Sequence, residues 1–141
     1  MTPVIQPTGD KAFAETLIRH NMVAYHQQLG WHWDTALFDQ QWRELESFEL
    51  VINATPVGVL CLHQEDDAYH IRELQIAPPW QRQGLGTAAL HFAEAHARQA
   101  GIHRLRLRVF RINPAIALYE RMGFRVLNTE EAVHAMERRI V

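Results

Sequence analysis

The pattern of polar and apolar positions changes period once along the chain, and the change separates an expected helical segment from an expected sheet. After a short strand over residues 3–7, apolar side chains recur at helical spacing through about Leu29. Asp10 is placed to cap this helix and Gly30 to end it. A second short helix is expected from about Thr35 to Leu45.

From residue 48 the apolar positions alternate with a period of two, which predicts strands joined by short turns. The first three strands should form an antiparallel meander. A helix then lies between two further strands, and such a crossover makes those two strands parallel. Asn113-Pro114 is expected to start another helix, with proline at its favoured first position, before two closing strands. The expected ranges are 48–52, 57–63, 69–76, 104–110, 124–127 and 133–140 for the strands and 84–99 for the helix between them.

Length and composition place the chain among globular proteins. Its 141 residues fit a single domain over 1–141, and 48% hydrophobic content is enough for a core. The formal net charge of -2 argues against a nucleic-acid partner. The single cysteine, Cys61, lies in an apolar run where a buried side chain is expected rather than a nucleophile. With no signal peptide pattern and no membrane-spanning window, we expect a cytoplasmic protein without a membrane partner.

A glycine-bearing segment, Gln81-x-x-Gly84-x-Gly86, stands where a strand gives way to a helix. The unpaired amides and positive dipole of a helix start bind phosphates, and glycine lets the main chain approach the anion. Arg82 could add a charged contact. A tight turn without any ligand is one alternative. A dinucleotide loop, Gly84-x-Gly86-x-x-Ala89, is another, but a meander precedes it and no acid follows the next strand.

Two blocks of sequence resemble the GNAT family of N-acetyltransferases. Residues 74–87 are similar to its acetyl-CoA-binding motif, Arg/Gln-x-x-Gly-x-Gly/Ala after a strand. Residues 113–124 are similar to its block Asn-x-x-Ala-x-x-Leu-Tyr-x-x-x-Gly-Phe. The resemblance covers about residues 47–140. It implies an α/β GNAT-like fold: a mixed, mostly antiparallel sheet of six or seven strands, with one βαβ crossover and helices on both faces.

The same resemblance implies acetyl-CoA as cosubstrate and no metal. The strand before the phosphate loop and the strand after its helix would splay apart to open a cleft. The pantetheine arm would pair with backbone near Gln75 and Ile76, and Asn113 would contact this arm. The pyrophosphate would meet the amides of Gln81, Arg82, Gln83, Gly84, Leu85, Gly86 and Thr87.

Two residues are expected to act as general acid and general base. Tyr119 matches the family's usual general acid, which protonates the departing coenzyme A thiolate. A base is also needed, since an ammonium has no lone pair with which to attack. The resemblance points to Glu73 as the leading candidate, because it lies in the central strand three residues before Ile76, where relatives often carry an acid. A packing tyrosine, an ion-paired strand glutamate and a water chain remain open alternatives.

The acceptor side is less specific. Trp31, His32 and Trp33 could form an aromatic wall of the acceptor site, or the tryptophans could pack helices onto the sheet. Arg106 and Arg108 share a strand face and could meet an acceptor carboxylate, unless that face is solvated or ion-paired. The implied activity is transfer of acetyl to a primary amine of a small molecule or peptide. A catalytically silent acyl-CoA-binding module is the alternative, and a homodimer is compatible with the resemblance.

Overall fold

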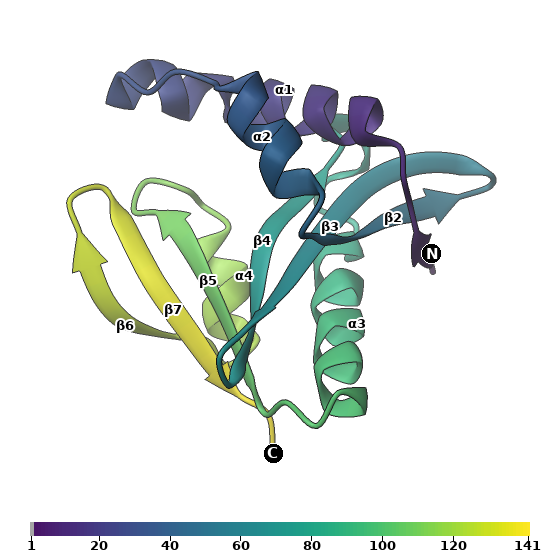
Figure 1. The fold of residues 1–141 in the computed structure, drawn as a ribbon, viewed down its shortest axis with the longest axis vertical. Helices are drawn as coiled ribbons and strands as arrows, with labels where there is room; N and C mark the ends of the chain where they lie inside the picture. The colour runs from purple at the N-terminus through teal and green to yellow at the C-terminus, as the bar shows by residue number, and fades with distance from the viewer. Residues whose placement is uncertain (1) are drawn as a thin grey trace.

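The computed structural model describes residues 2–141 as one seven-stranded mixed sheet with helices on both faces (Figure 1). The strand order is β1-β2-β3-β4-β5-β7-β6, in which only β4 and β5 run parallel. The α/β fold class, the βαβ crossover and the antiparallel meander are therefore confirmed. The elements are β1 (Val4–Pro7), α1 (Lys11–Leu29), α2 (Thr35–Trp42), β2 (Glu46–Ile52), β3 (Thr55–Glu65), β4 (Ala68–Ile76), a 3-10 turn η1 (Pro78–Trp80), α3 (Leu85–Gln99), β5 (Arg104–Phe110), α4 (Ile116–Arg121), β6 (Arg125–Glu130) and β7 (Val133–Arg139).

Two apolar clusters hold the helices on the two faces of the sheet. On one face, Ala14, Leu17 and Ile18 of α1 and Phe38 of α2 cluster with Val59 and Cys61 of β3. The larger cluster on the other face joins the sheet to α3 and α4. Buried positions alternate in β2, as a period of two predicts, whereas β3 is covered by both helical layers and is buried at six consecutive positions.

The sheet is split where the parallel strands β4 and β5 diverge. These strands pair at only three positions and the pairing ends at Ile71 and Leu107. Just beyond, Cys61 of β3 pairs with Glu73 while Leu62 pairs with Ile71, so that Arg72 is an extra residue in β4. Such a β-bulge bends its strand and increases the local twist. The two parallel strands diverge from this point toward their C-terminal ends (Figure 1).

Some predicted boundaries were wrong. The second helix ends at Trp42 rather than near Leu45, because β2 already begins at Glu46 and pairs with β3 there. The helix expected at Asn113-Pro114 begins at Ile116. Asn113 Oδ1 accepts a hydrogen bond from the Ala115 amide at 2.9 Å, which makes a turn of the segment ahead of the helix. In the described part of the chain, no helix is both long and apolar enough to span a bilayer.

Candidate active site

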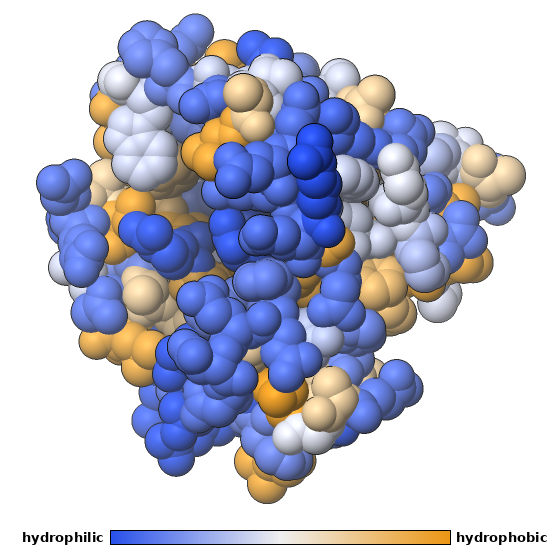
Figure 2. All heavy atoms as spheres, viewed as in Figure 1, coloured by the Kyte–Doolittle hydropathy of each residue, from blue (hydrophilic) through white to orange (hydrophobic). Residues whose placement is uncertain are grey.

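A cleft of about 1060 Å³ occupies the space where β4 and β5 diverge. Its walls come from the C-terminal half of α1, the ends of β4 and β5, the start of α3, and α4 with the loop before it. In the space-filling view, apolar surface gathers between the end of α1 and the tips of β5 and β6, and hydrophilic residues surround it (Figure 2). The cleft thus joins a polar loop at one end to an apolar wall at the other.

We call the end of the cleft at the start of α3 the phosphate end, because the sequence predicts phosphate binding there. Gly84 is the N-cap in a left-handed conformation (φ 82°), and no side chain caps the helix. The first helical amide with a backbone acceptor is that of Ala88, which donates to Gly84 O at 3.1 Å. The amides of Leu85, Gly86 and Thr87 have no acceptor anywhere in residues 2–141. These free donors and the positive end of the helix dipole make an anion site.

The backbone around the start of α3 also has an unusual conformation. Arg82 also has a positive φ of 62°, a backbone conformation that residues other than glycine rarely adopt. At Gly84 an added Cβ would meet no atom within 4 Å, so only the left-handed φ favours glycine there. At Gly86 a Cβ would come within 2.9 Å of Leu118 Cδ2 on α4. Gly86 therefore allows α3 and α4 to approach closely.

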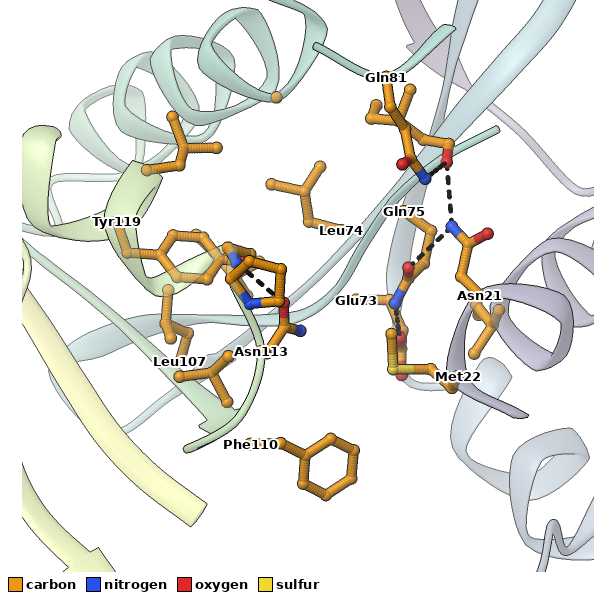
Figure 3. A pocket seen from close by; sticks show the side chains of 18 of the residues that line it. Asn21, Met22, Glu73, Leu74, Gln75, Gln81, Leu107, Phe110, Asn113 and Tyr119 are labelled. Atoms are coloured by element: carbon orange, nitrogen blue, oxygen red, sulfur yellow. Dashed lines mark hydrogen bonds between the residues drawn. The ribbon is translucent and has the colours of Figure 1, made fainter. Parts of the chain in front are cut away.

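At the other end of the cleft, Glu73 is held in a hydrogen-bonded chain that links β4 to α1 (Figure 3). Gln75 Nε2 donates to Glu73 Oε1 at 3.2 Å, and Asn21 Nδ2 donates to Gln75 Oε1 at 3.1 Å. Burial raises the pKa of the Glu73 carboxyl to about 7, against the opposing effects of the Gln75 hydrogen bond and the Arg72 charge. Glu73 can therefore take up and release a proton near neutral pH.

Tyr119 of α4 enters the cleft from the wall opposite Glu73 (Figure 3). Its ring is buried and lies edge-to-face against Phe124 at a centroid distance of 5.8 Å. Burial, and then the charge of Glu73, raise the pKa of Tyr119 to about 12. The phenol thus keeps its proton at neutral pH, which is the form that a proton donor requires.

An aromatic wall closes the far side of the cleft. Phe110, at the end of β5, stacks on Tyr25 of α1 at 5.8 Å and meets Trp31 edge-to-face at 5.0 Å. Trp31 remains 46% exposed, so part of its ring is free to contact a ligand. Trp33 also lines the cleft, but its Nε1 donates to Glu15 Oε2 at 2.8 Å and its ring lies against Phe38.

The chain matches a known protein family. The family model described as "Acetyltransferase (GNAT) family" matches residues 14–124. That match spans well over half of the 141 residues. The chain belongs to the GNAT acetyltransferase family.

Solved GNAT structures share the whole fold. The chain is similar to the PaiA N-acetyltransferase from Thermoplasma acidophilum in complex with coenzyme A, at 19% identity, with 99% of both chains covered and a TM-score of 0.74. It is also similar to a GNAT family acetyltransferase from Elizabethkingia anophelis with acetyl-CoA bound, at 17% identity, 99% coverage of both chains and a TM-score of 0.80. An acetyltransferase from Thermus thermophilus matches at 23% identity, with 99% of this chain and 98% of that chain covered and a TM-score of 0.78.

Most residues that were predicted for the site line the cleft of this GNAT domain. Glu73, Tyr119, Trp31 and Trp33 do so, whereas His32 is exposed and lies outside the lining. Gln83 is also outside it, and its Nε2 donates to Pro79 O at 3.2 Å. The cofactor residues that do line it are Gln75, Ile76, Gln81, Arg82, Gly84, Leu85, Gly86, Thr87 and Asn113.

The Ile76 carbonyl, which was expected near the pantetheine arm, is already hydrogen-bonded within the protein. It already accepts hydrogen bonds from Asn21 Nδ2 and Gln81 Nε2, both at 3.0 Å. A carbonyl oxygen has two lone pairs, so both are engaged here. A ligand arm that pairs with β4 must therefore use other main-chain groups of that strand.

The sequence analysis did not assign Asn21, Arg72 or Phe110 to the site, although all three line the cleft. Phe110 was expected only as the last residue of a strand. The polar Asn21 within an otherwise apolar helical pattern was a weak signal that could have drawn attention. Arg72 has no signal of its own, because its place depends on the bulge in β4.

The single cysteine is not part of the described cleft lining. Cys61 is buried between the sheet and α1, and burial raises the pKa of its thiol to about 12, so that the nucleophilic thiolate is disfavoured. Its predicted place in the core is confirmed. Across residues 2–141, no three His, Cys, Asp or Glu side chains gather in a way that could hold a metal ion.

Proposed function

We propose that this GNAT acetyltransferase transfers acetyl from acetyl-CoA to a primary amine of a small molecule or peptide by direct attack within a ternary complex. One observation carries the proposal. A single cleft contains an uncapped helix start, a buried tyrosine and a carboxyl whose pKa is about 7. These are an anion site, a proton donor and a proton acceptor, which are the three functions that the reaction needs.

The phosphate end fits the diphosphate of coenzyme A. The free amides of Leu85, Gly86 and Thr87 would donate to its oxygens, and Arg82 would add a charge-assisted contact. The pantetheine arm would then run back between β4 and β5, toward Glu73 and Tyr119. The CoA-bound PaiA protein and the acetyl-CoA-bound Elizabethkingia protein, which share this fold, support that placement.

Proton movement follows from the two titrating side chains. Glu73, when ionised, takes a proton from the ammonium directly or through water, and the amine nitrogen then bonds to the thioester carbonyl carbon. The carbon–sulfur bond breaks as the amide forms, and the sulfur leaves as a thiolate. Tyr119 gives its phenolic proton to that sulfur. The second proton of the amine nitrogen passes to solvent, which also returns the tyrosine to its starting state.

Holding both reactants in one cleft supplies much of the rate. Well-oriented groups reach effective molarities of about 10⁵–10⁸ M. No covalent acetyl-enzyme is part of this scheme, since Cys61 of β3 is buried in the core between the sheet and α1.

The test is a coenzyme A release assay over a panel of primary amines, with acetyl-CoA binding measured in parallel by calorimetry. We expect binding of acetyl-CoA and release of free thiol that depends on the amine. Binding without amine-dependent thiol release would instead establish a catalytically silent acyl-CoA-binding module. A protein that does not bind acetyl-CoA would contradict both descriptions.

A further inference from the structure

Two arginines stand at the point where β4 and β5 separate. Pairing between the strands ends at Ile71 and Leu107, and the next residue of each strand is Arg72 or Arg108. Both side chains are exposed and both line the cleft. Two like charges at adjacent strand positions repel each other unless a negative group lies near them.

Neither arginine forms an ion pair with the described residues, although the Arg72 charge acts on the neighbouring Glu73 carboxyl. Arg104 and Arg106, on the same face of β5, form ion pairs with Glu137, at 2.8 Å for Arg106 Nε. By contrast, Arg72 and Arg108 form no ion pair with any acid in residues 2–141. The face of β5 is thus ion-paired at its start and unpaired where it enters the cleft.

The charge of the whole lining is consistent with an anionic ligand group at this end. Glu73 is the one acid among the described lining residues, whereas four arginines line the cleft. Of these, Arg82 belongs to the phosphate loop and Arg121 to α4. Arg72 and Arg108 are therefore left for a second anionic group, on the side from which the amine approaches.

The anion site, the base and the aromatic wall are close neighbours. The bulge sets both Arg72 and Glu73 opposite Cys61, and side chains flanking such a bulge point to the same side of a sheet. Phe110 shares a strand face with Arg108, two residues away, and carries the wall of Tyr25 and Trp31. A ligand that uses all three features has its amine and its carboxylate only a few bonds apart, with an apolar group beside them.

We propose that the acceptor is a free α-amino acid with an apolar side chain, whose carboxylate is bound by Arg72 and Arg108 and whose amine lies beside Glu73. This inference rests on the proposed acetyltransferase function. Arginine suits the role because its planar guanidinium binds carboxylates through two parallel hydrogen bonds. The same two cations disfavour polyamines and other acceptors that carry several positive charges.

The experiment compares each of four amino acids with its primary amide, which lacks the negative charge but keeps the shape. Phenylalanine, tryptophan, leucine and methionine are assayed with their amides by thiol release, and rates are corrected for the fraction of neutral amine. We expect at least one amino acid to exceed its amide about tenfold in kcat/KM, as the loss of one charge-assisted hydrogen bond implies.

The variant Arg108→Met should remove that preference. Arg108 is chosen because loss of Arg72 would also change the pKa of Glu73. We expect the preferred amino acid to lose about tenfold in kcat/KM, mainly through KM, its amide to lose much less because it carries no negative charge, and Arg108→Lys to restore part of the loss. Arg139→Met, which removes an exposed arginine of β7, is the matched control and should change neither substrate.

The outcomes separate this inference from the proposed function. Equal use of amino acid and amide, or an equal loss for both in Arg108→Met, would overturn the amino-acid acceptor while the acetyltransferase activity stands. Binding of acetyl-CoA with no thiol release from any of the amino acids, amides or other amines would overturn both.

Discussion

The two ends of the cleft are built from different parts of the polypeptide. The phosphate end consists of main-chain amides at the start of α3, where a left-handed Gly84 leaves the helix uncapped. The reaction end consists of partly or fully buried side chains, Glu73 and Tyr119, whose pKa values are raised to about 7 and about 12. One end offers fixed dipoles, and the other offers groups that exchange protons.

A second contrast lies among the helix starts themselves. Asp10 caps α1 by accepting from the Phe13 amide at 3.0 Å, and Asp34 caps α2 by accepting from the Leu37 amide at the same distance. α3 has no such side chain. The aspartates satisfy amides at the starts of α1 and α2, whereas the amides at the start of α3 remain free to meet an anion. If the two ends of the cleft act separately, a change at one end should leave the function of the other intact.

The largest effect is expected at the reaction end. Tyr119→Phe and Glu73→Gln should each lower kcat by about 10²- to 10⁴-fold, the usual contribution of a general acid or base, with acetyl-CoA affinity unchanged. Wild-type activity should rise as the pH passes through about 7, because Glu73 must lose its proton to act as a base. Glu73→Gln should lack this rise. Full activity in either variant would remove that residue from the mechanism.

The next effect concerns the phosphate end. Gly84→Asp adds a carboxylate beside the free amides and should weaken acetyl-CoA binding about 100-fold in calorimetry, by repulsion and by competition for the donors. Gly84→Asn is the matched control, since both residues tolerate a left-handed conformation at a similar cost of about 1 kcal/mol. It should lose no more than about tenfold. Equal losses in the two variants would mean that shape, rather than charge, governs the site.

The smallest effect is on stability. The folded-state pKa of Glu73, about 7, lies above its ordinary value of 4.5, so the folded state binds this proton more tightly than the unfolded state does. Its contribution is fully favourable below pH 4.5 and is lost as the pH rises through 7. Glu73→Gln should therefore raise the free energy of unfolding at pH 8 by about 1–2 kcal/mol, with no gain at pH 4.

Urea denaturation at both pH values measures this change. Glu65→Gln, at an exposed carboxylate of β3, is the control and should alter stability by less than about 0.5 kcal/mol. A Glu73→Gln protein that is less stable than wild type at pH 8 would contradict the account of a buried, costly charge.

Most of the fold could be predicted because it depends on local patterns. The period of two in β2 follows from alternate burial, the continuous apolar run of β3 from burial on both faces, and glycines and prolines mark where several elements end. The start of α4 was misplaced because the Asn113 side chain makes a turn that residue order alone did not reveal. The divergence of β4 from β5 was expected only through the family resemblance, and its physical cause, the bulge at Arg72, has no sequence signal.

The two ends of the cleft also differ in how far local sequence determines them. The phosphate end is encoded by neighbouring residues, because a run from Gln81 to Gly86 sets its backbone. The reaction end brings together Asn21 and Gln75, which are 54 residues apart, and the wall brings Trp31 to Phe110. Such contacts depend on the tertiary fold. The sequence alone could not tell that Trp31 is an exposed wall residue and that His32 lies outside the cleft. Nor could it tell that Trp33 is a packing residue.

The most direct test of the account is titration calorimetry of the wild-type protein with acetyl-CoA and with S-acetylpantetheine, which carries the same thioester but no diphosphate. We predict measurable binding of acetyl-CoA and at least about 100-fold weaker binding of the truncated compound, since charge-assisted hydrogen bonds to the free amides of α3 would be lost. Equal affinity for the two compounds, or no heat with acetyl-CoA, would contradict the claim that the start of α3 holds the cosubstrate.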